Sequence, residues 1–123
     1  MLYQQIIRKL ENTEPCYFDN CLLLAEFLRA SFNQKSFPKT LLDRAEVLEK
    51  ESFVEIKRYF EKYGYSVSLN SVENFDLVLM SFSRCPCLGT YIDGFIFYMD
   101  GFGMNHQSLE TIGKYILYSY RMR

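Results

Sequence analysis

Three β-rich runs follow one another in residues 75–99, FDLVLMSFSRCPCLGTYIDGFIFYM. Apolar, β-branched and aromatic side chains dominate these runs, at 75–82, 87–92 and 95–99, and this composition predicts three strands. Asp93-Gly94 separates the last two runs, and the dipeptide suits a type I′ turn because both central residues of that turn need positive φ. We therefore expect an antiparallel sheet that contains this hairpin.

Two helices are predicted ahead of the sheet. Apolar residues at helical spacing predict a short amphipathic helix over 2–10. Residues 19–32, DNCLLLAEFLRASF, carry apolar side chains on more than one face, so this helix should be buried. Only Glu26 and Arg29 indicate a side that faces solvent.

A third helical stripe runs over residues 41–63 and ends at a glycine. Thr40 and Asp43 resemble a variant capping box at its start. The stripe predicts the longest helix of the chain, with a break around Glu51 and Ser52.

The remaining segments complete an α+β pattern. Residues 65–69 predict a strand, 101–105 a glycine-rich loop, and 114–121 the last strand, while Ser108 is a candidate cap of a short helical turn. Helices therefore come first and an antiparallel sheet follows. The expected fold is one α+β domain over residues 1–123, with N-terminal helices packed on a C-terminal antiparallel sheet.

The composition excludes several classes of function. With 49% hydrophobic and 24% charged residues, the chain resembles an ordinary globular domain. A net charge of -1 gives no broad basic surface, so we expect no nucleic-acid partner. No run approaches the roughly 18 apolar residues of a membrane span, and MLYQQIIRKL lacks the features of a signal peptide. We expect a chain that begins at Met1, folds in the cytoplasm, inserts into no membrane and, without a phosphate-binding loop, takes no cofactor.

The main candidates for chemical function are four cysteines, Cys16, Cys21, Cys85 and Cys87. Free thiols are the expected state because a domain of this size does not need disulfides. Cys21 begins the second predicted helix, where the positive end of the helix dipole favours the nucleophilic thiolate. A buried structural cysteine remains the commoner interpretation of such a position.

The order of these features resembles the NlpC family of cell-wall cysteine peptidases, which have a papain-like fold and include phage tail-associated members. In that family the nucleophile follows an aspartate and begins a helix, as Cys21 does in FDNCLLLAEFLR. A Gly-Asp-Leu-Val motif begins the core strand, and this chain has FDLV with Phe75 in place of the glycine. The next strand begins His-x-Gly-x-Tyr, which Cys87-Leu88-Gly89-Thr90-Tyr91 matches except at its first residue.

The resemblance implies a degenerate catalytic site. Cys21 takes the position of the nucleophile, whereas Cys87, or Cys85 if the register shifts by two, takes the position of the histidine. A cysteine cannot efficiently replace that general base near neutral pH. The residue that orients the histidine corresponds to Tyr98 or Met99. His106, the only histidine of the chain, is an alternative base only if its loop folds over the sheet.

Three functions are compatible with these residues. The first is a non-catalytic papain-like domain that serves as a structural or protein-interaction component of an assembly, as in a phage tail tip, and so ends in the virion. The second is an atypical cysteine peptidase or amidase that cleaves peptidoglycan peptides with Cys21 as nucleophile. The third is a module stabilised by zinc on Cys16, Cys21, Cys85 and Cys87, although the spacing is not that of paired CxxC knuckles. If Cys21 and Cys87 take the dyad positions, their sulfurs should be neighbours, and an oxidising setting could join them in a disulfide.

Overall fold

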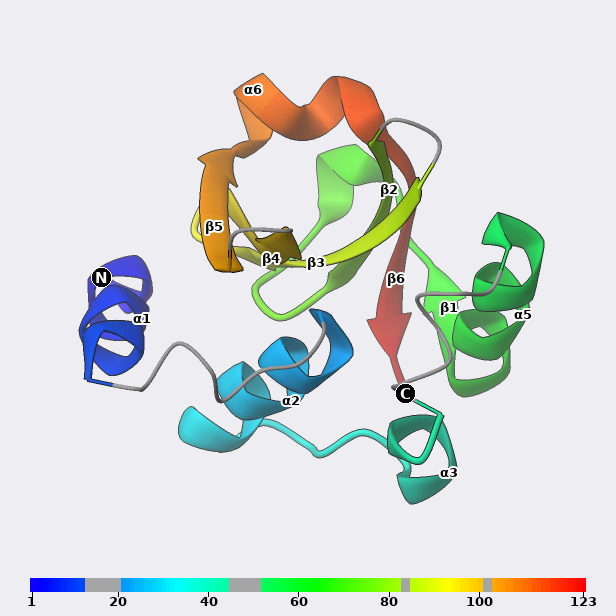
Figure 1. Ribbon diagram of the computed structural model, residues 1–123, viewed down its shortest axis with the longest axis horizontal. Coiled ribbons are helices and arrows are strands. Elements are labelled where there is room, and N and C mark those ends of the chain that lie inside the picture. Colours follow the sequence, from blue (N-terminus) through cyan, green and yellow to red (C-terminus); the bar gives the residue numbers. More distant parts are fainter. Residues whose placement is uncertain (13–20, 45–51, 83–84, 101–102) are drawn as a thin grey trace.

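A computed structural model describes residues 1–12, 21–44, 52–82, 85–100 and 103–123 (Figure 1). Its α-helices are α1 (Leu2–Glu11), α2 (Cys21–Ser31), α3 (Lys39–Leu42), α5 (Phe53–Tyr63) and α6 (Leu109–Ile112). Its strands are β1 (Gly64–Ser66), β2 (Leu77–Phe82), β3 (Cys85–Ile92), β4 (Phe95–Asp100), β5 (Gly103–Ser108) and β6 (Ile116–Met122). No helix in the described ranges combines the length and the apolar character that crossing a bilayer requires.

The six strands form one antiparallel sheet, in the order β1-β6-β2-β3-β4-β5. The predicted α+β class is confirmed, with helices ahead of the sheet and one further short helix, α6, between β5 and β6. The Asp93-Gly94 hairpin is also confirmed, since Asp93 has φ 49° and Gly94 has φ 87°. The Asp93 carboxylate accepts the backbone N–H of Tyr3 at 2.8 Å, which ties the first turn of α1 to the hairpin.

Helices cover the curved sheet at several places (Figure 1). α2 contacts β3 and β4, α5 contacts β1 and β6, and α6 contacts β4 and β5. The apolar face of α2 places Leu24 and Leu28 against Phe97 of β4, and Ile6 of α1 joins the same cluster. A larger cluster contains all four residues of the LVLM run in β2, each with no exposed surface. Apolar burial of this kind is the main source of stability for the fold.

Gly89 of β3 is required by the packing of the sheet. A Cβ atom at this position would meet the side chain of Ile96 and would lie 3.0 Å from Met80 Cε and 3.2 Å from Val78 Cγ2. These neighbours belong to β2 and β4, which flank β3 on both sides. A side chain at position 89 would therefore collide with packed side chains of both flanking strands.

The long third helix of the sequence prediction is divided. α3 ends at Leu42, and α5 begins after Ser52. The backbone of Ser52 is extended, and its side-chain oxygen accepts the N–H of Glu55 at 3.3 Å, which caps α5. The predicted break near Ser52 is confirmed, while Glu51 lies outside the described residues. The capping box is wrong, because Thr40 lies within α3 and its hydroxyl group bonds the Tyr63 hydroxyl group at 2.7 Å.

The glycine-rich loop predicted over 101–105 is wrong from Gly103 onward. Residues 103–108 form β5, which pairs with β4 from Gly103 opposite Asp100 to Ser108 opposite Phe95. The segment GMNHQS has little β propensity of its own, and the unpaired edge of β4 supplies the hydrogen-bond partners that make it a strand. Ser108 does cap the following α6, as predicted, by accepting the N–H of Thr111 at 3.3 Å.

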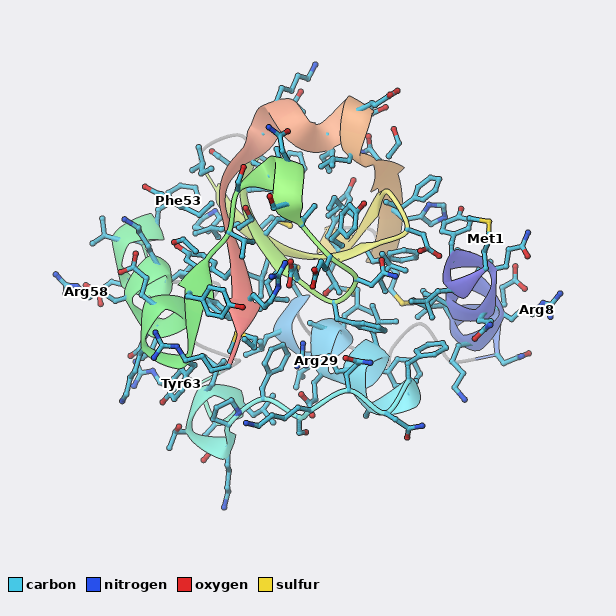
Figure 2. All side chains as sticks on the ribbon, turned by 180° about the vertical axis from the view of Figure 1, so that it is seen from behind. Met1, Arg8, Arg29, Phe53, Arg58 and Tyr63 are labelled. Atoms are coloured by element: carbon cyan, nitrogen blue, oxygen red, sulfur yellow. The ribbon has the colours of Figure 1, made fainter. Side chains whose placement is uncertain are left out.

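Arg29 does not face solvent, contrary to the expectation from the helical pattern. Figure 2 shows it beside α2 near the centre of the molecule, whereas Arg8 and Arg58 point outward at the periphery. Its guanidinium group donates to the carbonyl oxygens of Lys35 at 2.6 Å and Phe75 at 3.4 Å. Burial lowers the pKa of Arg29, and these carbonyl groups accept two of the guanidinium N–H groups in place of water.

Tyr120 of β6 is the largest fully buried side chain of the described core. Its ring packs on Phe60 of α5, with ring centroids 5.9 Å apart. Its hydroxyl group is buried and has no hydrogen-bond partner among the described residues. Burial, and secondarily the Glu61 carboxylate, raises the pKa of Tyr120. A buried hydroxyl group without a partner costs stability, which a phenylalanine at this position would not.

Candidate functional site

Cys21 is the first residue of α2, and its thiol is buried between the helix and β4. The backbone N–H of Met99 donates to Cys21 Sγ at 3.3 Å, and Cys21 Sγ in turn donates to the Met99 carbonyl oxygen at 3.5 Å. The thiol therefore satisfies both backbone groups of one residue of β4. Hydrogen bonds to sulfur are weak, but they hold the Cys21 side chain at a defined place on the sheet.

Cys87 lies on β3 opposite Met80 of β2, and its sulfur is 3.8 Å from Cys21 Sγ. The two residues are 66 positions apart in the sequence. The proximity predicted for Cys21 and Cys87 is thus confirmed. No disulfide joins the two sulfurs in the structure, and the 3.8 Å separation is a nonbonded contact.

The geometry at the end of the β3–β4 pairing brings the sulfurs together. The register of β3 with β4 ends at Gly89 opposite Tyr98, so the backbone of Met99 lies just past the last pair. Cys21 enters this position from α2, and Cys87 Sγ approaches the same Met99 carbonyl oxygen at 3.6 Å. Two thiols and one carbonyl group thus form the centre of the site. None of these groups is a general base at neutral pH.

Tyr98 is buried on β4, but its hydroxyl group is engaged elsewhere. The side-chain amide of Gln107 on β5 donates to Tyr98 Oη at 2.7 Å, and the Tyr98 ring lies 5.6 Å from the Phe82 ring. Met99, the other candidate for the orienting position, contacts both sulfurs through its backbone. Of the two residues predicted at the orienting position, Tyr98 thus bonds Gln107, and Met99 contacts the thiols through main-chain atoms.

His106 belongs to an aromatic cluster on the edge strand β5. It lies on β5 opposite Phe97, and its ring is 5.6 Å from the ring of Tyr3, 6.0 Å from that of Phe95 and 5.3 Å from that of Phe97. In the described part of the chain, no contact joins the His106 ring to Cys21 or Cys87. The loop movement that a catalytic His106 would need is opposed by the pairing of β5 with β4.

Cys16 lies outside the described residues, and so does the side chain of Cys85. The four-cysteine zinc site therefore stays a prediction. Among the side chains that the structure describes, no three histidine, cysteine or acidic groups come close enough together to hold a metal ion.

Phe75 and Asp76 form a conformational feature at the start of β2 that sequence reasoning described only in part. Phe75 has φ 74°, a conformation that favours glycine, yet its side chain is buried against α2.

Asp76 is 3% exposed and accepts Arg121 Nε at 3.1 Å and Arg121 Nη2 at 2.9 Å. The Asp76 hydrogen bonds raise the pKa of Arg121. This bidentate pair fastens the start of β2 to β6, and the aspartate directly before the apolar LVLM run was its only sequence signal.

Apolar side chains are also exposed near the start of β6. Tyr115, Leu117 and Tyr118 are 40%, 51% and 38% exposed. A shallow groove lies alongside them, lined by Ser66, Val67, Leu69, Ile116, Leu117, Tyr118 and Ser119. Exposed large apolar side chains at neighbouring positions make the start of β6 a candidate contact surface.

Comparisons with known proteins give no family assignment. No protein-family model matches the chain, and no curated protein matches it either.

Proposed function

We propose that this chain is a non-catalytic, NlpC-like domain of papain-like fold that serves as a structural or protein-interaction component of an assembly, as in a phage tail tip. The observation that carries the proposal is the 3.8 Å contact between Cys21 Sγ and Cys87 Sγ. Cys21 begins a helix, as the nucleophile of such an enzyme does, and a second thiol stands where the proton acceptor would be. A thiol with this neighbour lacks the imidazole that would deprotonate it and later protonate the leaving amine.

Two further features support the NlpC-like fold in this proposal. Phe75, which stands in place of a family glycine, has φ 74°, so the backbone retains a conformation that glycine adopts without strain. Gly89, which matches the glycine of the next family motif, has no room for a Cβ atom between Met80 and Ile96. At both positions the structure favours glycine, the residue that the family motifs have there.

The exposed Tyr115 and Tyr118 support the interaction part of the proposal, because tyrosine is enriched among the anchors of protein interfaces. The domain would fold in the cytoplasm and become part of the virion, with neighbouring proteins of the assembly as partners. Peptidoglycan would then be a surface that the assembly meets, without being cleaved by this domain.

The rate of Cys21 alkylation tests the proposal. The protein is treated with iodoacetamide across the pH range, and the modified cysteine is identified by peptide mass spectrometry, with Cys21→Ser as the control. We expect Cys21 to react no faster than a cysteine of the unfolded chain, and peptidoglycan peptides to remain uncleaved. Fast alkylation of Cys21 below neutral pH, together with cleavage of those peptides, would establish the atypical peptidase instead.

Metal analysis of the purified protein tests the zinc-stabilised module. One equivalent of zinc that is lost on replacing Cys21 would favour that module over the proposal.

A further inference from the structure

We propose that Cys21 and Cys87 are a redox modification site, which a low-molecular-weight disulfide converts into a reversible intramolecular disulfide. The proposal starts from the contact of the two sulfurs, 3.8 Å apart, although 66 positions separate the residues in the sequence. It holds whether or not the domain is NlpC-like, because it depends only on the contact and on thiol chemistry.

The movement needed to form the bond is small. A disulfide holds its sulfurs about 2.0 Å apart, so the pair must close by about 1.8 Å. Both sulfurs already point to the same acceptor, the carbonyl oxygen of Met99, at 3.5 Å and 3.6 Å. The side chains therefore converge before any oxidation takes place.

The hydrogen bonds around the pair allow the change. Oxidation removes both S–H donors, so the Met99 carbonyl oxygen loses the two weak hydrogen bonds that they give it. The backbone N–H of Met99 can still donate to Cys21 Sγ, since a disulfide sulfur keeps its lone pairs. The loss is small because hydrogen bonds from thiols are weak.

The exposure of the two thiols sets the order of the reaction. Cys21 is 8% exposed, whereas Cys87 is half-buried, so a dissolved reagent reaches Cys87 first. The Cys87 thiolate attacks the reagent disulfide, its S–S bond breaks, and one reagent thiolate leaves. The Cys21 thiolate then attacks the Cys87 sulfur and releases the second reagent thiolate. Two cysteine thiols lose two protons and two electrons, and one reagent disulfide becomes two thiols.

The new bond would connect the start of α2 to β3. It would close a loop between residues 66 positions apart, which restricts the unfolded chain strongly. We expect oxidation to raise the Tm by about 10 °C. The reduced form would be the one made in a reducing compartment, and the oxidised form would arise after transfer to an oxidising one.

Oxidised glutathione serves as the probe. The intact protein is equilibrated with it, remaining thiols are alkylated, and the digest is analysed without reduction. We expect a single linked pair of peptides that contain Cys21 and Cys87, a loss of two hydrogen atoms from the intact mass, and full reversal by dithiothreitol. A digest in which Cys21 and Cys87 are both alkylated, or both carry glutathione, would overturn the proposal.

Two variants separate this pair from other pairings. The chain with Cys16→Ser and Cys85→Ser should still form the bond and show the same rise in Tm on oxidation. Cys87→Ser should show neither, although its Cys21 remains. A bond that links Cys16 to Cys21 or Cys85 to Cys87 in the parent chain, or a rise in Tm that survives Cys87→Ser, would show that the contact seen here is not the reactive pair.

Discussion

Replacing Cys87 by histidine tests whether the site descends from a cysteine peptidase. In Cys87→His, an imidazole would replace the thiol that lies 3.8 Å from Cys21 Sγ. If the backbone has the dyad geometry, the imidazole can accept the Cys21 proton and leave a thiolate–imidazolium pair. Residue 87 is half-buried, so part of the new ring can face solvent.

The separation of the sulfurs sets the size of the effect. Opposite unit charges about 4 Å apart attract by about 4 kcal/mol at an effective dielectric constant of about 20, which corresponds to roughly a thousandfold gain in thiolate formation. Two effects keep the gain in alkylation rate below this factor. The thiolate population cannot rise further once the thiol is fully ionised, at about pH 6, and a thiolate of lower basicity is a weaker nucleophile. The net expectation is that Cys21 is alkylated about tenfold faster than in the parent chain.

The assay is the rate of iodoacetamide modification at Cys21, followed by peptide mass spectrometry from about pH 5 to pH 9, a range that spans the ordinary histidine and cysteine pKa values. Cys87→Ser is the matched control, because it removes the second sulfur without supplying a base. Acceleration in Cys87→His alone would support the dyad geometry. Equal rates in the two variants, with both shown to be folded by circular dichroism, would refute the reasoning from family positions.

Three further substitutions test the packing around the site. Gly89→Ala should lower the free energy of unfolding by about 2 kcal/mol in urea denaturation, because its Cβ meets side chains of both flanking strands. Gly113→Ala should be nearly neutral, because its Cβ would lie 3.9 Å from Leu109 Cδ1, an ordinary contact. Asp76→Asn should lower the free energy of unfolding, because the carboxylate accepts two N–H groups of Arg121 and the backbone N–H of Glu73; an unchanged urea midpoint would contradict this role. Tyr120→Phe should be neutral or stabilising by about 1 kcal/mol, since the hydroxyl group is buried without a partner. Because burial raises the pKa of Tyr120, the parent should lose stability above about pH 10, where unfolded tyrosine ionises, and the variant should lose less; equal losses in thermal scans would contradict this.

Local signals made the hairpin and most helices predictable. Asp93-Gly94 fixes the turn through two positive φ angles, and the spacing of apolar residues located α1 and α2. β5 was not predictable in this way, because its residues gain their strand conformation from pairing with β4. Arg29 was misplaced for a similar reason, since the carbonyl oxygens of Lys35 and Phe75 that make its burial possible belong to other segments.

The candidate site was predictable only where a family resemblance supplied long-range information. It placed Cys21 beside Cys87 across 66 positions, and the structure has them in contact. The role of the Met99 backbone was not visible, because main-chain groups leave no mark in the residue pattern. The pairing of Asp76 with Arg121 was hidden for another reason, since it joins residues 45 positions apart that were each predicted only as part of a strand.

The place of β6 in the sheet has a consequence for how the chain folds during synthesis. β6 is made after the other described strands of the sheet, yet it lies between β1 and β2 in the interior of the sheet. Until it leaves the ribosome, β1 has no strand to pair with among the described ones, and β2 presents a bare edge of apolar residues. Nascent chains that stall before Ile116 would expose that edge to other chains and would depend on chaperones to avoid aggregation.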